Sequence, residues 1–211
     1  MDTPLNVAIL VYPGVEMIDM NGPADVFIKA NNLNGGKYRL YTVAENNQPL
    51  ISEASIVAIT PAYSITNCPS PDIIVIPGQI LSEDPYQSGS GSPALIDWLI
   101  QVSQKTGIII MSVCVGAYIL AKTGLLTGKK ATTHYDAIDY LQKQYAKIQF
   151  IKNVRYVQDG NFITTGGITS GIDGALHLIE QLDSPDIAQQ VANVMVYNTK
   201  APLPPGTILP T

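Results

Sequence analysis

The stretch "GIIIMSVCVGAYILAKTGLL", residues 107–126, joins a continuous apolar run to a segment with helical spacing, and Cys114 lies between the two. A short apolar run rich in β-branched residues is typical of a strand that is buried on both faces of a parallel sheet. Gly116 and Ala117 follow the cysteine and allow the chain to reverse closely. The pattern predicts a strand, a tight turn and a helix with the thiol at the turn, which is the arrangement called a nucleophile elbow.

The same alternation of strand and helix extends along the chain. Two further buried strands are expected in "LNVAILVY" (5–12) and "DIIVIPG" (72–78), and Asp159-Gly160 between two alternating runs predicts a hairpin. The segment 13–23, "PGVEMIDMNGP", is expected to be a turn-rich loop. Repeated strand and helix predict an α/β three-layer sandwich with a mostly parallel central sheet. Helical spacing is found in residues 24–33, 94–107, 115–126, 170–182 and 184–198.

The composition bounds the class of protein. Hydrophobic residues make up 46% of the 211 residues and charged residues 14%, which, with the length, predicts one compact domain over residues 1–198. The prolines of "TKAPLPPGTILPT" predict an extended tail over 199–211. The net charge of −5 and the scattered 12 Lys and Arg disfavour nucleic-acid binding. We expect no membrane span, because no apolar stretch approaches the roughly 20 residues required. The two cysteines and the lack of a leader favour a cytoplasmic protein.

Polar residues follow three of the predicted strands. Glu16 and Asp19 come after the first strand, Gly78 and Gln79 after the middle one, and Cys114 after the third. The carboxyl ends of parallel strands meet in one crevice, where ligands bind. We therefore expect these residues to gather at one site.

Two interpretations of Cys114 are open. At a helix N-terminus, unpaired N–H groups and the helix dipole favour the thiolate and lower the thiol pKa by one or more units from about 8.5. Free cysteine is also among the most buried residue types, and a buried Cys114 would be an inert hydrophobe.

The partner of a nucleophilic thiol is also open. His134 either enters the crevice or caps the helix that follows it, and His177 is expected to be a helix-packing residue. Asp19 or Glu16 is the other candidate, provided that desolvation keeps one carboxyl partly protonated, although Asp19 would also suit the start of a helix.

Other motifs have mainly structural interpretations. In "TTGGITSGID" (164–173), Ser170 and Asp173 have the spacing of a capping box, while residues 167–169 are candidates for the pocket lining. The loop "SEDPYQSGSGSP" (82–93) is either a surface linker or a substrate lid. Separated histidines and cysteines do not predict a metal site, and no Gly-rich phosphate motif predicts a nucleotide, so we expect no metal and no cofactor.

Several ordered motifs together resemble the ThiJ/PfpI superfamily. They are "VAILVYPGVEMIDMNGPADVF", "DIIVIPG", "SVCVGAYILAKTGLLTGKKATTH" and "DGNFITTGGITSGIDGALHLIE". The resemblance implies a flavodoxin-like, class I glutamine amidotransferase-like fold. Within the superfamily the motifs are most similar to the isocyanide hydratase branch and to the amidase-like domains of AraC-type regulators. Those regulators carry a helix-turn-helix region after this domain, so we expect a free-standing enzyme here.

The hydratase resemblance implies that isocyanide and water give an N-formamide. It implies Cys114 as the nucleophile, Asp19 as the group that exchanges protons, and backbone N–H groups near Gly78 and Val115 as a polar cradle. Val115 stands where the hydratases have Thr. The substrate would be a small molecule and the protein a homodimer. Further candidates for the lining are Gln79, which stands in Pro-Gly-Gln where Pro-Gly-Gly is usual, His134 and Thr169.

Three alternatives stand beside the hydratase. A ligand-binding or redox-sensing protein would oxidise Cys114 reversibly. A glyoxalase-like or chaperone-like member is the second alternative, and a glyoxalase would use a Glu at the position of Asp19 together with His134. A peptidase is least favoured, because Val115 stands where proteolytic members place a His after the cysteine.

Overall fold

The computed structural model describes residues 3–79 and 91–198. The predicted tail over 199–211 and most of the 82–93 loop lie outside the described residues. A seven-stranded sheet forms the centre, with the strand order β10-β11-β7-β6-β1-β2-β5, and only β10 runs antiparallel to its neighbour. The strands are β1 (Leu5–Leu10), β2 (Tyr38–Ala44), β5 (Tyr63–Ser64), β6 (Ile73–Ile76), β7 (Ile109–Ser112), β10 (Tyr156–Asp159) and β11 (Phe162–Thr165).

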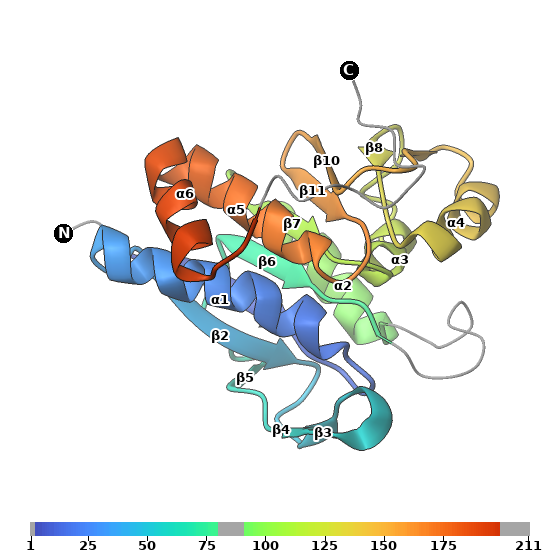
Figure 1. Cartoon of the computed structure of the whole chain (residues 1–211). Coiled ribbons are helices and arrows are strands. Elements are labelled where there is room, and N and C mark those ends of the chain that lie inside the picture. The colour runs from blue at the N-terminus through green and yellow to red at the C-terminus, as the bar shows by residue number, and fades with distance from the viewer. Residues whose placement is uncertain (1–2, 80–90, 199–211) are drawn as a thin grey trace.

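Helices cover both faces of this sheet, which confirms the predicted three-layer sandwich (Figure 1). Alternate strand residues enter opposite cores: Val7 and Ile9 pack with one group of helices, and Ala8 and Leu10 with the other. This alternation explains why the central strands are apolar throughout. The first group is α1 (Met17–Asn34), α5 (Ser170–Leu182) and α6 (Pro185–Val194); the second is α2 (Pro93–Val102), α3 (Gly116–Lys122) and α4 (Ile138–Gln144).

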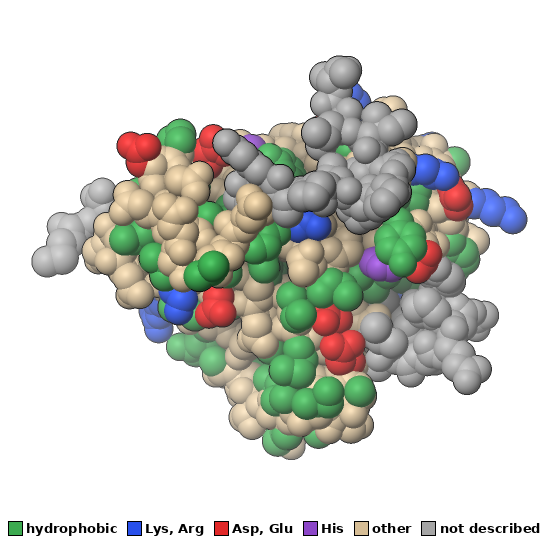
Figure 2. Space-filling view, in the orientation of Figure 1, with side chains coloured by type: hydrophobic (Ala, Val, Ile, Leu, Met, Phe, Trp, Pro, Cys, Tyr) green, Lys and Arg blue, Asp and Glu red, His purple; other side chains and the backbone are tan. Residues whose placement is uncertain are grey.

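Smaller elements lie outside the main sheet. They are the antiparallel pair β3 (Leu50–Ile51) and β4 (Ala58–Ile59), the parallel pair β8 (Lys130–Ala131) and β9 (Gln149–Phe150), and two 3₁₀ turns, Glu53–Ser55 and Tyr135–Ala137. On the face shown in Figure 2, basic and acidic side chains are scattered among hydrophobic ones. Among the described residues, no helix is long and apolar enough to cross a membrane.

The predicted loop over residues 13–23 is wrong in its second half, because α1 begins at Met17. The Glu16 carboxylate accepts a hydrogen bond from the Asp19 N–H at 2.6 Å and caps the helix. Gly22 and Pro23 indicate a loop by local rules, but Gly22 lies close to the Ile172 side chain of α5. Packing of α1 on α5 therefore outweighs the local preference for a turn.

The predicted hairpin is present at β10 and β11. Asp159 pairs with Phe162, so Gly160 and Asn161 form a two-residue loop, and Gly160 has the positive φ of 65° that such loops require. The segment before it, Gln149–Phe150, pairs with β8 instead of joining the hairpin.

Candidate active site

The turn between β7 and α3 has the predicted elbow geometry. Cys114 has a φ of 55°, a left-handed conformation that costs a non-glycine residue about 1–3 kcal/mol and that clusters at functional sites. A Cβ on Gly116 would lie 2.2 Å from the carbonyl oxygen of Ile76, so only glycine fits where the elbow passes β6. The fold therefore fixes the sulfur at the carboxyl edge of the sheet.

The first turn of α1 and the end of β6 bring Asp19 and Gly78 to the same place. The Gly78 N–H donates to Asp19 Oδ2 at 2.8 Å. A Cβ on Gly78 would lie 2.6 Å from Asp19 Oδ2, 3.1 Å from Val115 Cγ2 and 3.2 Å from Cys114 Cβ. Four residues expected at the site are thus in close proximity, and the absence of a side chain at Gly78 leaves the space between them.

Asp19 is fully buried, and one backbone N–H, that of Gly78, donates to its carboxyl group. Its Oδ1 has no hydrogen-bond partner. Burial is the main reason that its pKa is raised to about 9; the neighbouring Glu16 and Glu53 raise it further, and the N–H of Gly78 opposes them. Asp19 therefore holds a proton at neutral pH and can donate it.

The pKa of Cys114 is raised, which contradicts the first of the two open interpretations, an acidic thiol. Burial is the largest cause, since the residue is only 8% exposed, and the charge of Asp19 acts in the same direction. Two backbone N–H groups, those of Ile168 and Val115, donate to the sulfur and lower the pKa. Of the two effects that the sequence left open, the helix N-terminus and burial, burial is the larger here.

Ile168 is a site residue that local sequence rules identify only as part of the 167–169 segment. It has a φ of 30°, which is unusual for a β-branched residue, and this conformation accompanies the N–H that donates to Cys114. Gly166, two positions before Ile168, accepts a hydrogen bond from the Cys114 N–H at 2.9 Å through its carbonyl oxygen. The two glycines before Ile168 indicate an irregular turn, but only the fold places that turn on the thiol.

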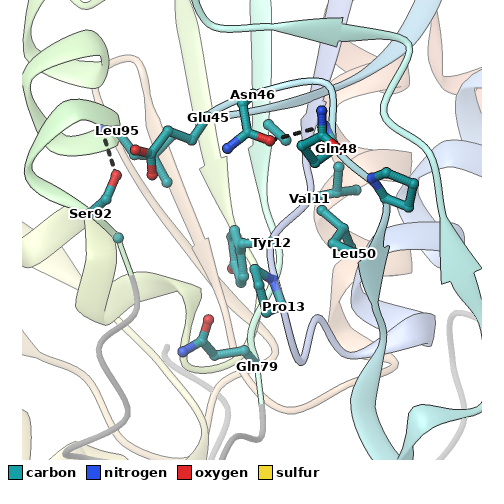
Figure 3. A pocket seen from close by; sticks show the side chains of 13 residues that line it. Val11, Tyr12, Pro13, Glu45, Asn46, Gln48, Leu50, Gln79, Ser92 and Leu95 are labelled. Atoms are coloured by element: carbon teal, nitrogen blue, oxygen red, sulfur yellow. Dashed lines mark hydrogen bonds between the residues drawn. The ribbon is translucent and has the colours of Figure 1, made fainter.

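A pocket of about 420 Å³ lies over the ends of β1 and β2 and beside the start of α2 (Figure 3). Tyr12 and Gln79 line it, and Cys114 does not. The hydroxyl of buried Tyr12 donates to the carbonyl oxygen of Pro77, and burial, followed by Asp19 and Cys114, raises its pKa. The lining is Val11, Tyr12, Pro13, Ala44, Glu45, Asn46, Gln48, Pro49, Leu50, Gln79, Gly91, Ser92 and Leu95.

His134 caps the turn Tyr135–Ala137, and its ring lies against Gly167, in the segment that precedes Ile168. Its Nδ1 accepts from the Asp136 N–H at 3.4 Å, and its ring lies so close to Gly167 that a Cβ there would be 2.8 Å from His134 Cδ2. Burial lowers its pKa. His177 packs as expected, stacked on Tyr156 and bonded to a glutamine on β10.

The predicted capping box at Ser170 and Asp173 is wrong. Thr169 occupies the N-cap position of α5, without a capping side-chain bond, and Ser170 is the first residue of the helix. Asp173 instead binds Arg155 and Tyr197, and the Thr169 hydroxyl accepts from Arg155 at 3.2 Å. The capping-box spacing is present, but the Asp173 carboxylate binds Arg155, which lies 18 positions earlier in the chain.

Within the described residues, no three His, Cys, Asp or Glu side chains gather in a way that could hold a metal ion.

Comparison with known proteins agrees with this geometry. The model of the DJ-1/PfpI family matches residues 5–181. The chain belongs to the DJ-1/PfpI family. A solved ThiJ/PfpI family protein from Pseudomonas syringae shares 28% identity with a TM-score of 0.81, covering 97% of this chain and 79% of that one. The superfamily inferred from the motifs, and its flavodoxin-like, glutamine amidotransferase-like fold, are thereby confirmed.

Relatives of different function lie within this family. The chain is 32% identical to isonitrile hydratase of Pseudomonas putida over 206 residues. This alignment covers 95% of this chain and 81% of the hydratase. The chain is 25% identical over 193 residues to the HTH-type transcriptional regulator CdhR of Pseudomonas aeruginosa, covering 92% of this chain and 55% of the regulator. The family therefore includes both an enzyme and a regulator.

Proposed function

We propose that this protein is a cofactor-independent hydratase that converts an isocyanide and water into an N-formamide, with Cys114 as the nucleophile and Asp19 as the proton carrier. The observation that carries the proposal is the position of a buried, proton-holding Asp19 beside the elbow thiol. The similarity to isonitrile hydratase supports the choice of substrate.

The reaction needs only these two groups and water. Sulfur forms a bond to the isocyanide carbon, that carbon takes the proton of the Asp19 carboxyl, and the resulting carboxylate accepts the thiol proton. Water then adds to the C=N bond of the thioimidate, with one proton passing through Asp19 to nitrogen. The C–S bond breaks, and the N-formamide leaves as the thiol regains its proton. A side chain with a pKa near the operating pH suits such repeated transfer.

Val115 leaves the polar part of this arrangement intact. The Thr hydroxyl implied by the hydratase resemblance is replaced by methyl groups, one of which faces Gly78. The N–H groups of Ile168 and Val115 still donate to the sulfur, and they come from the backbone. The proposal therefore includes that Val115 is tolerated, with a more apolar wall beside the reacting carbon.

The competing functions make other demands on the site. A redox sensor needs an accessible thiolate, whereas Cys114 is 8% exposed and its pKa is raised. A glyoxalase would use His134, whose Nδ1 is occupied by the Asp136 N–H. The expected homodimer, the cytoplasmic location and the single domain over residues 1–198 stay predictions.

The test is formamide production from a simple aryl isocyanide, followed by absorbance. Wild-type protein is compared with Cys114→Ala and with Cys68→Ala, which removes the other free thiol. We expect turnover by the wild type and Cys68→Ala and none by Cys114→Ala. Full turnover by Cys114→Ala would overturn the nucleophile, and no turnover by any of the three would overturn the isocyanide assignment.

A further inference from the structure

The turn that supplies an N–H to the thiol is strained and needs support. Ile168 has a φ of 30°, and a residue in such a conformation persists only where its surroundings hold it. Backbone bonds fix the residue two positions earlier, since Gly166 N–H donates to Arg155 O at 2.8 Å and Gly166 O accepts from the Cys114 N–H. On the other side of Ile168, the Ser170 N–H donates to Gly167 O at 2.9 Å and the Gly171 N–H donates to Ile168 O at 3.3 Å.

Three side chains add to these backbone bonds on that other side. The Arg155 Nε donates to Asp173 Oδ2 at 2.8 Å, and its Nη2 donates to the same carboxylate and to the Tyr197 hydroxyl at 2.7 Å. The Tyr197 hydroxyl in turn donates to Asp173 at 2.9 Å. We call Arg155, Asp173 and Tyr197 the clamp. It joins the start of β10, the first turn of α5 and the segment after α6.

The clamp reaches the residue next to Ile168. Arg155 Nη2 donates to the Thr169 hydroxyl at 3.2 Å, and the Tyr197 hydroxyl lies 3.5 Å from the Thr169 carbonyl oxygen. Arg155 therefore holds the turn on both sides of Ile168, through its backbone at Gly166 and through its side chain at Thr169. The Asp173 side chain is only 12% exposed and the Arg155 side chain 30%, so these bonds are partly shielded from water.

We propose that the clamp is a positioning device, which fixes the Ile168 N–H on the Cys114 sulfur and thereby makes the thiol more nucleophilic. Its members do not touch the sulfur. The titratable groups that act on Cys114 directly are Asp19 and Glu16, and Tyr12 lies near enough for Cys114 to influence it. The inference rests on Cys114 being the reactive thiol of the proposed function, but it concerns the thiol itself and can be tested without turnover.

The opposite end of α5 offers a matched control. There Asp183 binds Lys37 at 2.8 Å and the Tyr38 hydroxyl at 2.6 Å, so a carboxylate again joins a cation and a tyrosine. This network lies at the C-terminal end of the helix, whereas the clamp lies at its N-terminal end beside the thiol. Removing the cation or the tyrosine hydroxyl from each of the two networks separates positioning of the thiol from general stability.

The experiment measures alkylation of Cys114 by iodoacetamide from pH 6 to 9 in a Cys68→Ala background. The clamp variants are Arg155→Met and Tyr197→Phe, and the controls are Lys37→Met and Tyr38→Phe. Below the thiol pKa, the rate follows the thiolate fraction, so a loss of the N–H that raises the pKa by one unit slows alkylation about tenfold at each pH. We expect about a tenfold loss for Arg155→Met, about threefold for Tyr197→Phe, and less than twofold for the controls.

Melting temperatures of all variants complete the test. Equal losses of melting temperature at the two networks, with alkylation unchanged in the clamp variants, would show that the clamp is merely structural. Slower alkylation in all four variants would show general loosening and would also overturn the proposal. Should Arg155→Met fail to fold, Tyr197→Phe, which removes one hydroxyl, decides. Alkylation of Cys114 can be measured even if the protein does not hydrate isocyanides. Failure of the proposed function can therefore be distinguished from failure of this inference.

Discussion

Asp19 and Asp183 are both largely buried carboxyls beside the ends of helices, and the protein holds them in opposite protonation states. The pKa of Asp19 is raised to about 9, and its Oδ1 has no partner. The pKa of Asp183 is lowered: burial opposes ionisation there too, but hydrogen bonds from Lys37, Tyr38 and Asn34 outweigh it. The number and charge of the donors therefore decide the protonation state, since burial acts in the same direction on both.

The difference separates a structural carboxylate from a chemical one. At Asp183, the donors satisfy the charge and tie the end of α5 to residues 34–38. At Asp19, the Gly78 N–H donates to Oδ2 while Oδ1 has no hydrogen-bond partner, and Glu16 and Glu53 lie near enough to oppose ionisation. A group left in this condition costs stability and is typical of a functional site.

Replacing Asp19 should give the largest effect. We expect Asp19→Asn to lower hydratase turnover at least 100-fold, because the amide cannot carry the proton. The same change should raise the free energy of unfolding at pH 7.5 by about 1–3 kcal/mol, because the folded state no longer has to bind a proton there. Turnover assays and urea unfolding measure the two effects. A variant that is active, or less stable than the wild type, would contradict the role of Asp19.

Replacing Asp183 should give the reverse pattern. Asp183→Asn leaves the Lys37 ammonium without its carboxylate, and we expect a loss of about 2–4 kcal/mol in the free energy of unfolding. Turnover and alkylation of Cys114 should stay within twofold of the wild type. Asp186→Asn, at an exposed position in the first turn of α6, is the matched control and should cost less than about 0.5 kcal/mol. A large loss of turnover in Asp183→Asn would mean that the two ends of α5 are coupled.

The parts of the molecule that local patterns determine were predictable from the sequence. The continuous apolar runs placed β1, β6 and β7 in a buried parallel sheet, and the small residues after Cys114 indicated the elbow. These features depend on neighbours in the chain. Asp19 and Gly78 were also expected at the site, because strands of a parallel sheet end at one edge.

The features that were wrong or missed depend on distant partners. The start of α1 at Met17 depends on packing against α5, and Asp173 turns to Arg155, a residue 18 positions earlier, instead of capping its own helix. The raised pKa of Cys114 depends on burial, which a strand-turn-helix pattern does not specify. Sequence patterns thus located the site but not its electrostatics.

The pH dependence of stability sharpens the comparison between the two aspartates. Because the pKa of Asp19 is raised from about 3.8 to about 9, its folded form binds more protons than the unfolded chain between those values, and its contribution to stability falls as the pH rises through that window. The pKa of Asp183 is lowered, so its contribution is present above the usual value and is lost as the pH falls through the folded value. The two groups therefore act in opposite pH ranges.

Urea unfolding at several pH values can separate these contributions. We expect the stability gain of Asp19→Asn over the wild type to grow by about 1–2 kcal/mol between pH 5 and pH 7, since one pKa unit corresponds to about 1.4 kcal/mol and neighbouring carboxyls share part of the change. The deficit of Asp183→Asn should stay constant over the same range and shrink only below about pH 4. A gain for Asp19→Asn that does not change with pH would show that the carboxyl is already ionised in the folded protein, and the proton that the proposed reaction takes from it would have to come from another group.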